Sequence, residues 1–329
     1  MAVSVIISNM NGIKFLPRLL QCIRDQRNVK VQIIVVDRLS CDGSKEYLNL
    51  QNDVTVVDVP PESGLVSGYA AGVPFALNEH LFFCNEDMWF DLDCFSLLEN
   101  SINLSEQIVA ADPWQWTYDE KHLIHGGVGF FDSFWNPLCP LPKIKYALTL
   151  QMPVNQRIPF ACAGAFMIHR QAYEQAGGWD SAFFLDHEDV DLFIRIWQMD
   201  KSCVTVPNAR VYHAVGSSNY QVIPALNTPV RRRRYISGNA SVSIIGIKYF
   251  KGIWLLYAYF FPLLAISKEL VRFRFHLAWL AILSAIEVMQ RYRTAKRFRL
   301  SWEKWIRRNP GQNFFLDSNF HIKPNKIKL

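Results

Sequence analysis

The run Val3-Ser4-Val5-Ile6-Ile7 opens an alternation of short β-branched segments and helical patterns, and this alternation decides the fold. Further strands are predicted at 31–36, 54–57 and 81–83, and helices are predicted near 15–25, 44–50 and 67–77. Strands that alternate with helices in this way form a parallel sheet with helices packed on its faces. We therefore predict an α/β domain with a mostly parallel central sheet.

Polar residues follow three of the predicted strands: Ser8-Asn9, Asp37 and Asn85-Glu86-Asp87. In open sheets of this class, ligands bind outside the carboxyl ends of the strands. The three polar strand ends therefore predict a nucleotide-type cleft. We expect Asp37 to contact the base or ribose of a nucleoside, whereas the following Asp42-Gly43-Ser44 builds a turn and starts a helix.

A carboxylate at Asp87 can hold a divalent cation against a diphosphate, because Mg²⁺ and Mn²⁺ prefer oxygen ligands and often share them with phosphates. An acidic strand end is equally often a turn or a helix cap. His213, in Val211-Tyr212-His213, can supply a neutral imidazole to a metal or diphosphate site, although a single histidine is more often structural. The sequence thus offers Asp87 and His213 as metal ligands.

The stretch 62–72 is a glycine-spaced loop that leads into a helix, where the backbone at Gly64 and Gly68 can approach a ligand closely. Its spacing is not specific for phosphate. It lacks the lysine of a nucleoside triphosphate site and does not match a dinucleotide fingerprint.

Four acidic side chains, Asp186, Glu188, Asp189 and Asp191, lie within six residues among apolar neighbours. Crowded carboxylates raise one another's proton affinity, which suits a general base or a metal site. The structural alternative is that Asp186 caps a helix beginning near His187 and that Asp191 pairs with Arg195 one turn later.

Residues 112–160 are rich in Trp, Pro and Phe, and we predict irregular structure there. Loops of this length in a compact domain are usually functional. Beyond it come an apolar segment at 163–168, a predicted helix at 171–176, a predicted helix that ends at 199 and the segment 203–206.

The charge distribution divides the chain into two parts. Residues 1–230 contain 15 Lys and Arg against 25 Asp and Glu, whereas residues 231–329 contain 20 against 4. We predict one domain over 1–230 and a basic, aromatic-rich helical extension over 231–329. The basic residues of the extension alternate with long apolar runs, which favours an anionic membrane surface over nucleic acid as the partner.

The apolar runs of the extension, 253–266 and 277–286, are shorter than a membrane span. Aromatic helices with flanking Lys and Arg are suited to the headgroup region of an anionic leaflet. The alternative is a helical cap with a solvated basic face. The seven cysteines have no close-spaced pair and indicate a reducing compartment, and the run at 3–7 is too short for a signal peptide. We therefore expect a peripheral protein at the cytoplasmic face of the inner or plasma membrane.

Taken in order, these motifs resemble the family 2 glycosyltransferases, and among them the bacterial rhamnosyltransferase-like branch. The resemblance covers about residues 3–220. The matching stretches are 4–7 with Asn11-Gly12, 36–44, 62–72, Cys84-Asn85-Glu86-Asp87, 164–167, Gly177-Gly178-Trp179-Asp180, Glu188-Asp189-Val190-Asp191-Leu192, and 207–213 with Gly216-Ser217.

The resemblance implies a GT-A fold, a nucleotide-diphosphate sugar donor, a divalent cation (Mg²⁺ or Mn²⁺) and inversion at the anomeric carbon. It gives Asp37 to the nucleoside, Asp87 and His213 to the metal or diphosphate, and Asp189 to the base, with Glu188 beside it. We also assign five residues to donor binding: Asn9, Gly64, Gly68, Asn85 and Trp179.

The expected reaction is transfer of a hexose or deoxyhexose to a polysaccharide or lipid-linked glycan acceptor. Tyr69-Ala70 and Arg38-Leu39 depart from the pattern of the branch and bear on the choice of donor sugar. Two alternatives are weighed beside it: a nucleotidyltransferase, for which Asn9 to Lys14 offers a single lysine, and a membrane-bound scaffold whose active site is degenerate.

Overall fold

The computed structural model describes residues 2–60, 63–127, 130–131, 154–214, 229–310, 312 and 321–322. The described residues form two compact units. An α/β unit contains 2–179 and 192–214, together with 321–322, and a helical unit contains 180–191 and 229–312. Each unit has its own structural logic.

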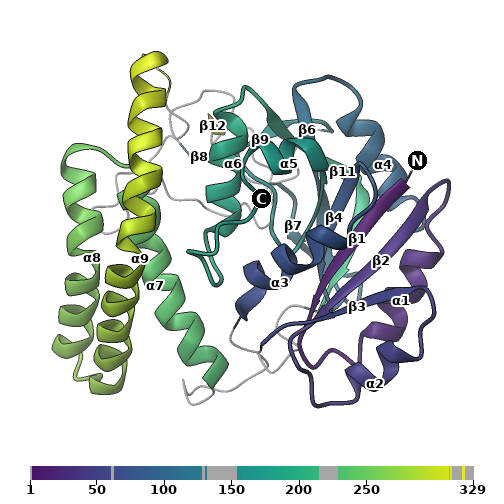
Figure 1. The fold of residues 1–329 in the computed structure, drawn as a ribbon, viewed down its shortest axis with the longest axis horizontal. Helices are drawn as coiled ribbons and strands as arrows, with labels where there is room; N and C mark the ends of the chain where they lie inside the picture. The colour runs from purple at the N-terminus through teal and green to yellow at the C-terminus, as the bar shows by residue number, and fades with distance from the viewer. Residues whose placement is uncertain are drawn as a thin grey trace. The chain divides into compact units, whose positions relative to one another are not determined.

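The α/β unit is built on one mixed sheet, which has ten strands among the described residues (Figure 1). The strand order is β3-β2-β1-β4-β10-β6-β11-β5, with β7 paired to β6 and β9 paired to β11. The strands are β1 (Ala2–Asn9), β2 (Lys30–Asp37), β3 (Val54–Asp58), β4 (His80–Asn85), β5 (Met88–Phe90), β6 (Ile108–Thr117), β7 (Leu123–His125), β9 (Arg157–Ile158), β10 (Ala165–His169) and β11 (Ser202–His213). Two further short strands, β8 (Phe130–Phe131) and β12 (His321–Ile322), pair with each other.

The predicted α/β class is confirmed, and the parallel part of the sheet is its N-terminal part. β1 pairs in parallel with both β2 and β4, and β2 pairs in parallel with β3. Beyond β4, β10 runs antiparallel to β4 and to β6, while β6 and β11 are parallel to each other. The sheet is therefore parallel where the sequence alternates strands with helices, and mixed beyond that region.

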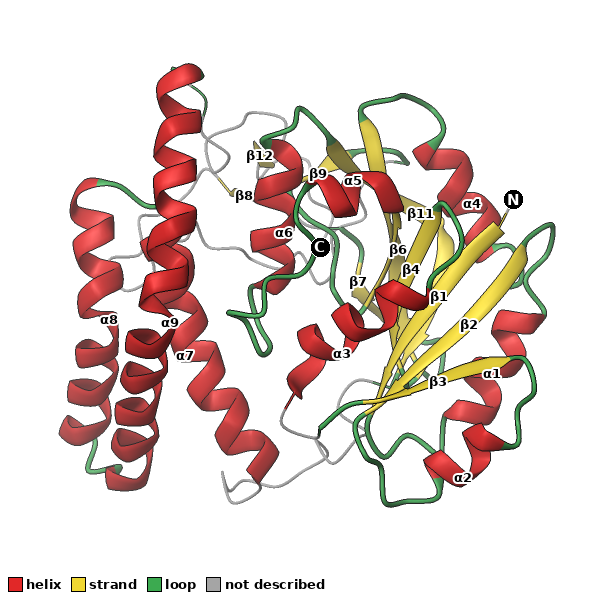
Figure 2. Ribbon diagram, in the orientation of Figure 1, coloured by secondary structure: helices red, strands yellow, loops and turns green. Residues whose placement is uncertain are grey.

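Helices cover both faces of this sheet, which explains why its strands are continuous apolar runs. Val3, Val5 and Ile7 of β1 pack in one core with α1, α2 and α4. On the opposite face α3 lies so close to the sheet that a Cβ on Gly72 would come within 2.6 Å of Ile6. Figure 2 shows these layers around the strands. The helices of this unit are α1 (Leu16–Arg24), α2 (Ser44–Asn49), α3 (Gly64–Gly72) with the 3₁₀ turn Val73–Phe75, α4 (Cys94–Ile102) and α5 (Arg170–Gln175), and α6 (Glu188–Trp197) begins in the helical unit and ends here.

The prediction of irregular structure over 112–160 is wrong where β6, β7, β8 and β9 occupy it. Its Trp-rich and Pro-rich composition hides β6, which includes Pro113. Pro113 has no N–H for the ladder and is tolerated because the register of β6 and β11 shifts beside it, between Val206 and Arg210. The remainder, 128–129 and 132–153, lies outside the described residues.

Three long helices form the helical unit: α7 (Pro229–Tyr249), α8 (Gly252–Val271) and α9 (Phe275–Arg308). The C-terminal helices that the sequence predicts are therefore confirmed, while the boundary at 230 stays a prediction. Pro262 lies inside α8. Among the described helices, none combines the length and the apolar character that crossing a membrane requires.

Candidate functional site

The parallel register brings the polar strand ends together at one edge of the α/β unit. Asn9 at the end of β1 pairs with Asp37 at the end of β2, and Ser8 pairs with Asn85 at the end of β4. Asn9 donates from Nδ2 to Asp37 Oδ1 at 2.6 Å. Three of the residues predicted to bind the donor therefore lie side by side.

Asp37 is fully buried, and its carboxylate is oriented before any ligand arrives. Oδ1 accepts from Asn9 and from the Ser40 hydroxyl at 2.6 Å, and Oδ2 accepts from the Ser40 backbone N–H at 2.9 Å. Because a carboxylate oxygen can accept two hydrogen bonds, Oδ2 keeps one acceptor position for a hydroxyl or N–H of a ligand.

The glycines of α3 lie against the same strand ends. A Cβ on Gly68 would stand 2.6 Å from the Ser8 hydroxyl, so no side chain fits between α3 and β1 at this point. Gly64 begins α3 with a φ of 75°, a conformation that suits glycine. Within the described part of the chain, the buried Ser8 hydroxyl and Asn9 Oδ1 have no hydrogen-bond partner. Sequence reasoning did not assign a role to Ser8, although it stands in the polar Ser8-Asn9 pair.

Tyr69 connects Asn85 with Trp179. Its hydroxyl lies 2.8 Å from Asn85 Oδ1 and 3.1 Å from the Ala163 carbonyl, to either of which it can donate. Its ring stacks on Trp179 with centroids 5.8 Å apart. Trp179 also packs edge-on against Phe83, so part of its role is to fill an aromatic core on this face of the sheet. The departure at Tyr69 thus has a structural reason in this chain.

Asp87 and His213 form the predicted pair. Asp87 lies in the turn between β4 and β5, and His213 ends β11, which is antiparallel to β5. His213 Nε2 and Asp87 Oδ1 are 3.1 Å apart, and His213 Nδ1 is 3.3 Å from Gln115 Oε1. Both side chains are buried or nearly so.

The chemistry of this pair fits a divalent cation shared with a ligand. Within the described part of the chain, no group of three or more His, Cys, Asp and Glu could hold a metal ion. A carboxylate and an imidazole supply two ligands, and Mg²⁺ or Mn²⁺ commonly completes its shell with phosphate oxygens and water. The pair is therefore suited to a cation that arrives with a diphosphate.

Glu86, beside this pair, was not assigned by sequence reasoning. Burial and, less strongly, the negative charge of Asp87 raise the pKa of Glu86 to about 7, and Arg38 acts in the opposite direction. Arg38 Nε is itself buried, and it has no hydrogen-bond partner among the residues that the structure describes. Glu86 lies within the acidic triplet at the strand end, and that triplet was the signal that could have identified it.

In the helical unit, Glu188 and Asp189 form the first turn of α6. Both are buried, and no described residue forms a hydrogen bond with Glu188 Oε2. Burial raises the pKa of Glu188 well above its usual range, and the charge of Asp189 raises it further. Asp186 and His187, directly before the helix, have φ values of 70° and 69°. Left-handed conformations at two non-glycine residues are strained and are concentrated at functional sites.

The other two acidic residues of the cluster have structural partners. Asp186 forms an ion pair with Arg234 at 3.4 Å. Asp191 accepts hydrogen bonds from Lys248 and from the Tyr249 hydroxyl. In the α/β unit, Arg195 donates to the carbonyl oxygens of Ala176 and Gly178. The acidic cluster thus divides into a buried pair, Glu188 and Asp189, and two flanking anchors.

Comparisons with known proteins agree with this geometry. The family model described as Glycosyl transferase family 2 matches residues 4–177. Polypeptide N-acetylgalactosaminyltransferase 11 of Xenopus tropicalis is 26% identical over 197 residues, which cover 55% of this chain and 32% of that protein. Polypeptide N-acetylgalactosaminyltransferase 8 of Drosophila melanogaster is 24% identical over 240 residues, covering 67% of this chain and 39% of that protein. The chain therefore spans about a third of the length of these relatives.

Solved structures with a similar fold include two that cover 93% of this chain. GalNAc-T7 with UDP, GalNAc and Mn²⁺ has a TM-score of 0.57 at 17% identity, covering 93% of this chain and 56% of that one. The mannosyltransferase PcManGT from Pyrobaculum calidifontis, in complex with GDP-Man and Mn²⁺, has a TM-score of 0.50 at 17% identity, covering 93% and 86%. At this identity the likeness shows the fold, and the predicted GT-A fold with C-terminal helices is confirmed.

Proposed function

Since the chain belongs to glycosyl transferase family 2, we propose that it is a metal-dependent, inverting glycosyltransferase. It moves a hexose, or a deoxyhexose such as rhamnose, from a nucleotide diphosphate to a hydroxyl of a polysaccharide or lipid-linked glycan of the cell envelope. The cluster of Asn9, Asp37 and Asn85 at one sheet edge, with the unpartnered Ser8 hydroxyl beside it, carries this proposal. Similar folds solved with UDP or with GDP-Man, each with Mn²⁺, support the donor class.

The donor contacts follow from the chemistry of each residue. Asp37 accepts hydrogen bonds from the nucleoside through its free Oδ2 position. Asn9 and Asn85 contribute amides at the strand ends, and Gly64 and Gly68 let the backbone of α3 lie close to these strand ends, beside the donor. Trp179 completes the donor site as an apolar wall.

Asp87 and His213 would hold the cation. When bound, it stabilises the negative charge that develops on the leaving diphosphate. Asp87 contributes a carboxylate oxygen and His213 the imidazole Nε2, and their 3.1 Å separation in the structure supports a shared ligand. Mg²⁺ and Mn²⁺ both suit this ligand set.

Asp189 is the general base. The acceptor hydroxyl oxygen attacks the anomeric carbon, the bond from that carbon to the diphosphate breaks, and the diphosphate leaves with the electron pair. Asp189 takes the hydroxyl proton, because a sugar hydroxyl is a poor nucleophile near neutral pH. Burial and the charge of Asp189 raise the pKa of Glu188, so Glu188 holds a proton more readily than a free carboxyl does, and we assign the role of proton acceptor to Asp189.

A panel of nucleotide diphosphates tests the donor site. Thermal unfolding of the full chain is measured with UDP, dTDP and GDP, with and without Mn²⁺, because a ligand that binds the native state stabilises it. We expect one nucleotide to raise the melting temperature in a metal-dependent way. No shift with any nucleotide in a folded sample would contradict the proposal and favour the degenerate scaffold.

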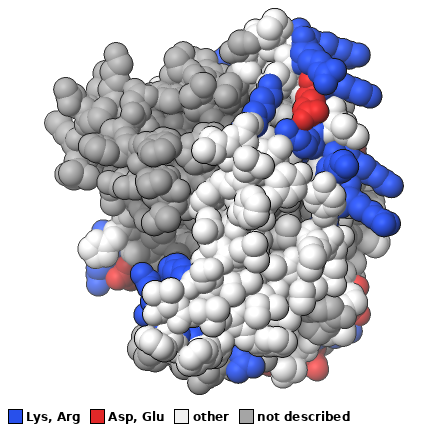
Figure 3. Space-filling view, turned by 90° about the vertical axis from the view of Figure 1, so that its left-hand side faces the viewer, with Lys and Arg blue, Asp and Glu red and all other residues white. Residues whose placement is uncertain are grey.

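We also propose that the helical unit binds an anionic membrane surface, at the cytoplasmic face of the inner or plasma membrane. The apolar face of α8 and α9 is exposed: Ile253 is 70% exposed, Phe260 56% and Trp279 59%. Figure 3 shows a broad uncharged surface with Lys and Arg gathered at its edges. Apolar residues framed by cations complement an anionic leaflet, where lipid-linked acceptors reside.

Vesicle flotation tests this partner. We expect the full chain to float with phosphatidylglycerol-containing vesicles and not with neutral phosphatidylcholine vesicles. The double variant Phe260→Ser and Trp279→Ser should lose binding, whereas Leu50→Ser, at a still more exposed apolar residue of the α/β unit, should not. Equal flotation of the wild type and the double variant would contradict the proposal, as would failure of the wild type to float.

A further inference from the structure

Lys248, near the end of α7, is fully buried. Its ammonium group donates to Asp180 Oδ2 at 2.7 Å and to Asp191 Oδ1. The neighbouring Tyr249 hydroxyl donates to the same Asp191 oxygen at 2.7 Å. One lysine thus joins two carboxylates that stand eleven positions apart in the sequence.

Aromatic rings enclose this ion cluster. The Lys248 ammonium lies 3.9 Å from the ring centroid of Phe298 on α9 and 5.3 Å from that of Phe183. The rings keep water out and attract the cation through their faces. A charge in such surroundings is costly unless its partners are fixed, so the positions of Asp180 and Asp191 are tightly coupled to Lys248.

The two carboxylates bracket the segment that carries the proposed base. Asp180 begins the segment, and Asp191 lies in the first turn of α6, immediately after Glu188 and Asp189. Between them stand Asp186 and His187 with their left-handed backbone. A strained turn persists only where the surrounding structure over-determines it.

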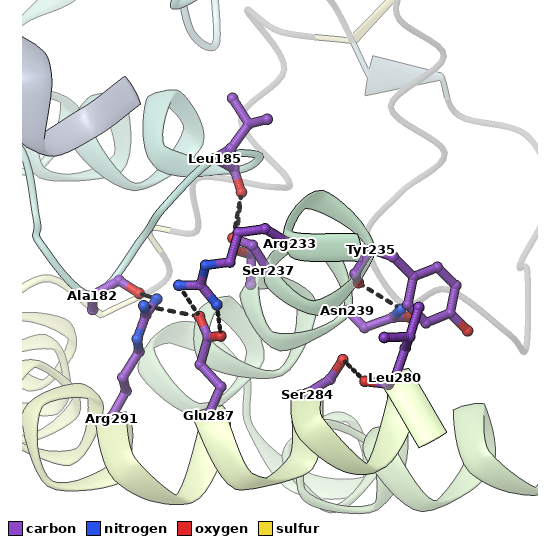
Figure 4. Close-up of polar contacts among 11 residues, drawn as sticks. Ala182, Leu185, Arg233, Tyr235, Ser237, Asn239, Leu280, Ser284, Glu287 and Arg291 are labelled. Atoms are coloured by element: carbon purple, nitrogen blue, oxygen red, sulfur yellow. Dashed lines mark hydrogen bonds and ion pairs between the residues drawn. The ribbon is translucent and has the colours of Figure 1, made fainter. Parts of the chain in front are cut away.

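Further contacts hold the segment to the same helices, as Figure 4 shows. Ser237 on α7 donates to the Leu185 carbonyl at 3.0 Å, and Arg291 on α9 donates to the Ala182 carbonyl. Glu287 fixes Arg291 through an ion pair at 2.8 Å. Residues 180–191 accordingly belong to the helical unit, although they precede it in the chain by almost forty residues.

We propose that Lys248 is a positioning residue of the transfer reaction, which holds both ends of 180–191 so that Glu188 and Asp189 keep their catalytic geometry. This inference rests on the proposed function. A buried ion cluster is weak support for stability, because well-packed apolar side chains serve as well. An ion pair is directional, so it fixes the orientation of a nearby catalytic base more specifically than apolar packing does.

The test replaces Lys248 in the full chain and separates position from stability. Lys248→Met keeps the side-chain length and removes the charge. We expect kcat to fall about 100-fold, the loss typical of a misplacement of about 1 Å. The donor KM should stay within about twofold, because the proposed donor contacts are made by other residues. Tyr249→Phe, which removes a single hydroxyl and keeps the fold, should lower kcat by roughly 3- to 10-fold.

Two controls distinguish a positioning role of Lys248 from a purely structural role. The triple variant Lys248→Met, Asp180→Asn and Asp191→Asn removes the unpaired charges, so we expect its melting temperature to recover while kcat stays low. Leu280→Ala weakens α9 through a buried residue outside the ion cluster, so the melting temperature should fall with kcat unchanged. Full recovery of kcat in the triple variant would overturn the inference.

Hydrogen exchange of 181–191 gives a readout that does not require turnover. We expect faster exchange in Lys248→Met than in Leu280→Ala. If no donor is turned over by the wild type, the proposed function fails, and the exchange rates still decide whether Lys248 holds the segment. If the wild type is active while Lys248→Met has normal kcat and normal exchange, the inference fails and the proposed function stands.

Discussion

Replacing Asp37 by Asn tests the link between the strand-end geometry and donor binding. The substitution keeps the shape of the side chain and removes its charge. Asp37 is buried at the end of β2, so the effects on stability and on ligand affinity both follow from its hydrogen bonds.

The magnitudes come from those bonds. Three reach the carboxylate, from Asn9 at 2.6 Å and from the Ser40 hydroxyl and N–H at 2.6 and 2.9 Å. A hydrogen bond to a charged group contributes about 1.5–3 kcal/mol and one between neutral groups about 0.5–1.5 kcal/mol. The variant should therefore lose up to roughly 3 kcal/mol of unfolding free energy. Loss of the charged bond to the nucleoside should weaken Kd by about 10- to 100-fold.

Titration calorimetry with the nucleotide that stabilises the wild type, in Mn²⁺, measures the affinity, and urea unfolding measures the stability. Asp53→Asn is the matched control, since Asp53 forms an exposed ion pair with Arg24 and should change stability by less than about 1 kcal/mol. A destabilised Asp37→Asn protein with the Kd of the wild type would refute the reasoning, because Asp37 would then be structural alone.

Three further predictions concern other parts of the chain. Asp87→Asn should abolish the Mn²⁺-dependent part of nucleotide binding and leave the metal-free part unchanged, as measured by the same titration; an undiminished Mn²⁺ effect would exclude Asp87 as a ligand. Gly72→Ala should reduce the unfolding free energy by about 1–3 kcal/mol in urea, because the new Cβ would lie 2.6 Å from Ile6 and 3.0 Å from Val36, both held in strands; an unchanged midpoint would mean that α3 shifts freely. The pKa of Glu188 is raised in the folded state, so folding favours its protonated form. Glu188 contributes its full stability when the pH is below 4.5, the usual pKa of the group. This contribution is lost as the pH rises toward the raised pKa of the folded state. As the pH rises from ~5 to ~8, the unfolding free energy of Glu188→Gln should therefore fall less than that of the wild type. An equal fall in the two proteins would contradict the raised pKa.

The sequence predicts the parallel half of the sheet well, because buried strands and amphipathic helices alternate there with clear periodicity. Parallel register then brings Asn9 and Asp37 together without further information. The sequence did not predict β6, because its Trp and Pro residues obscure the alternating pattern of a strand. Pro113 is tolerated through a shift in the register between β6 and β11, which depends on the partner strand.

Contacts between distant segments mark the limit of prediction. The polar strand end suggested Asp87 and the His213 motif suggested an imidazole, but their 3.1 Å separation depends on β11 lying beside β5. The residues around Lys248 in the sequence do not predict its burial, because its partners Asp180 and Asp191 are more than fifty residues away. Both partners also belong to a motif for which the sequence predicts a catalytic role. The sequence predicts the C-terminal helices as a membrane-binding extension. Their contacts with 180–191 become visible only in the structure.

The most direct test of the central claim compares the wild type with Asp189→Asn. The measured quantity is the rate at which each protein releases nucleotide diphosphate from a sugar donor that carries the stabilising nucleotide, in the presence of Mn²⁺ and a glycan acceptor. The account predicts acceptor-dependent release by the wild type and a loss of about 10²- to 10⁴-fold in the variant, with the donor Kd unchanged. Equal release by both proteins would contradict the assignment of Asp189 as the base.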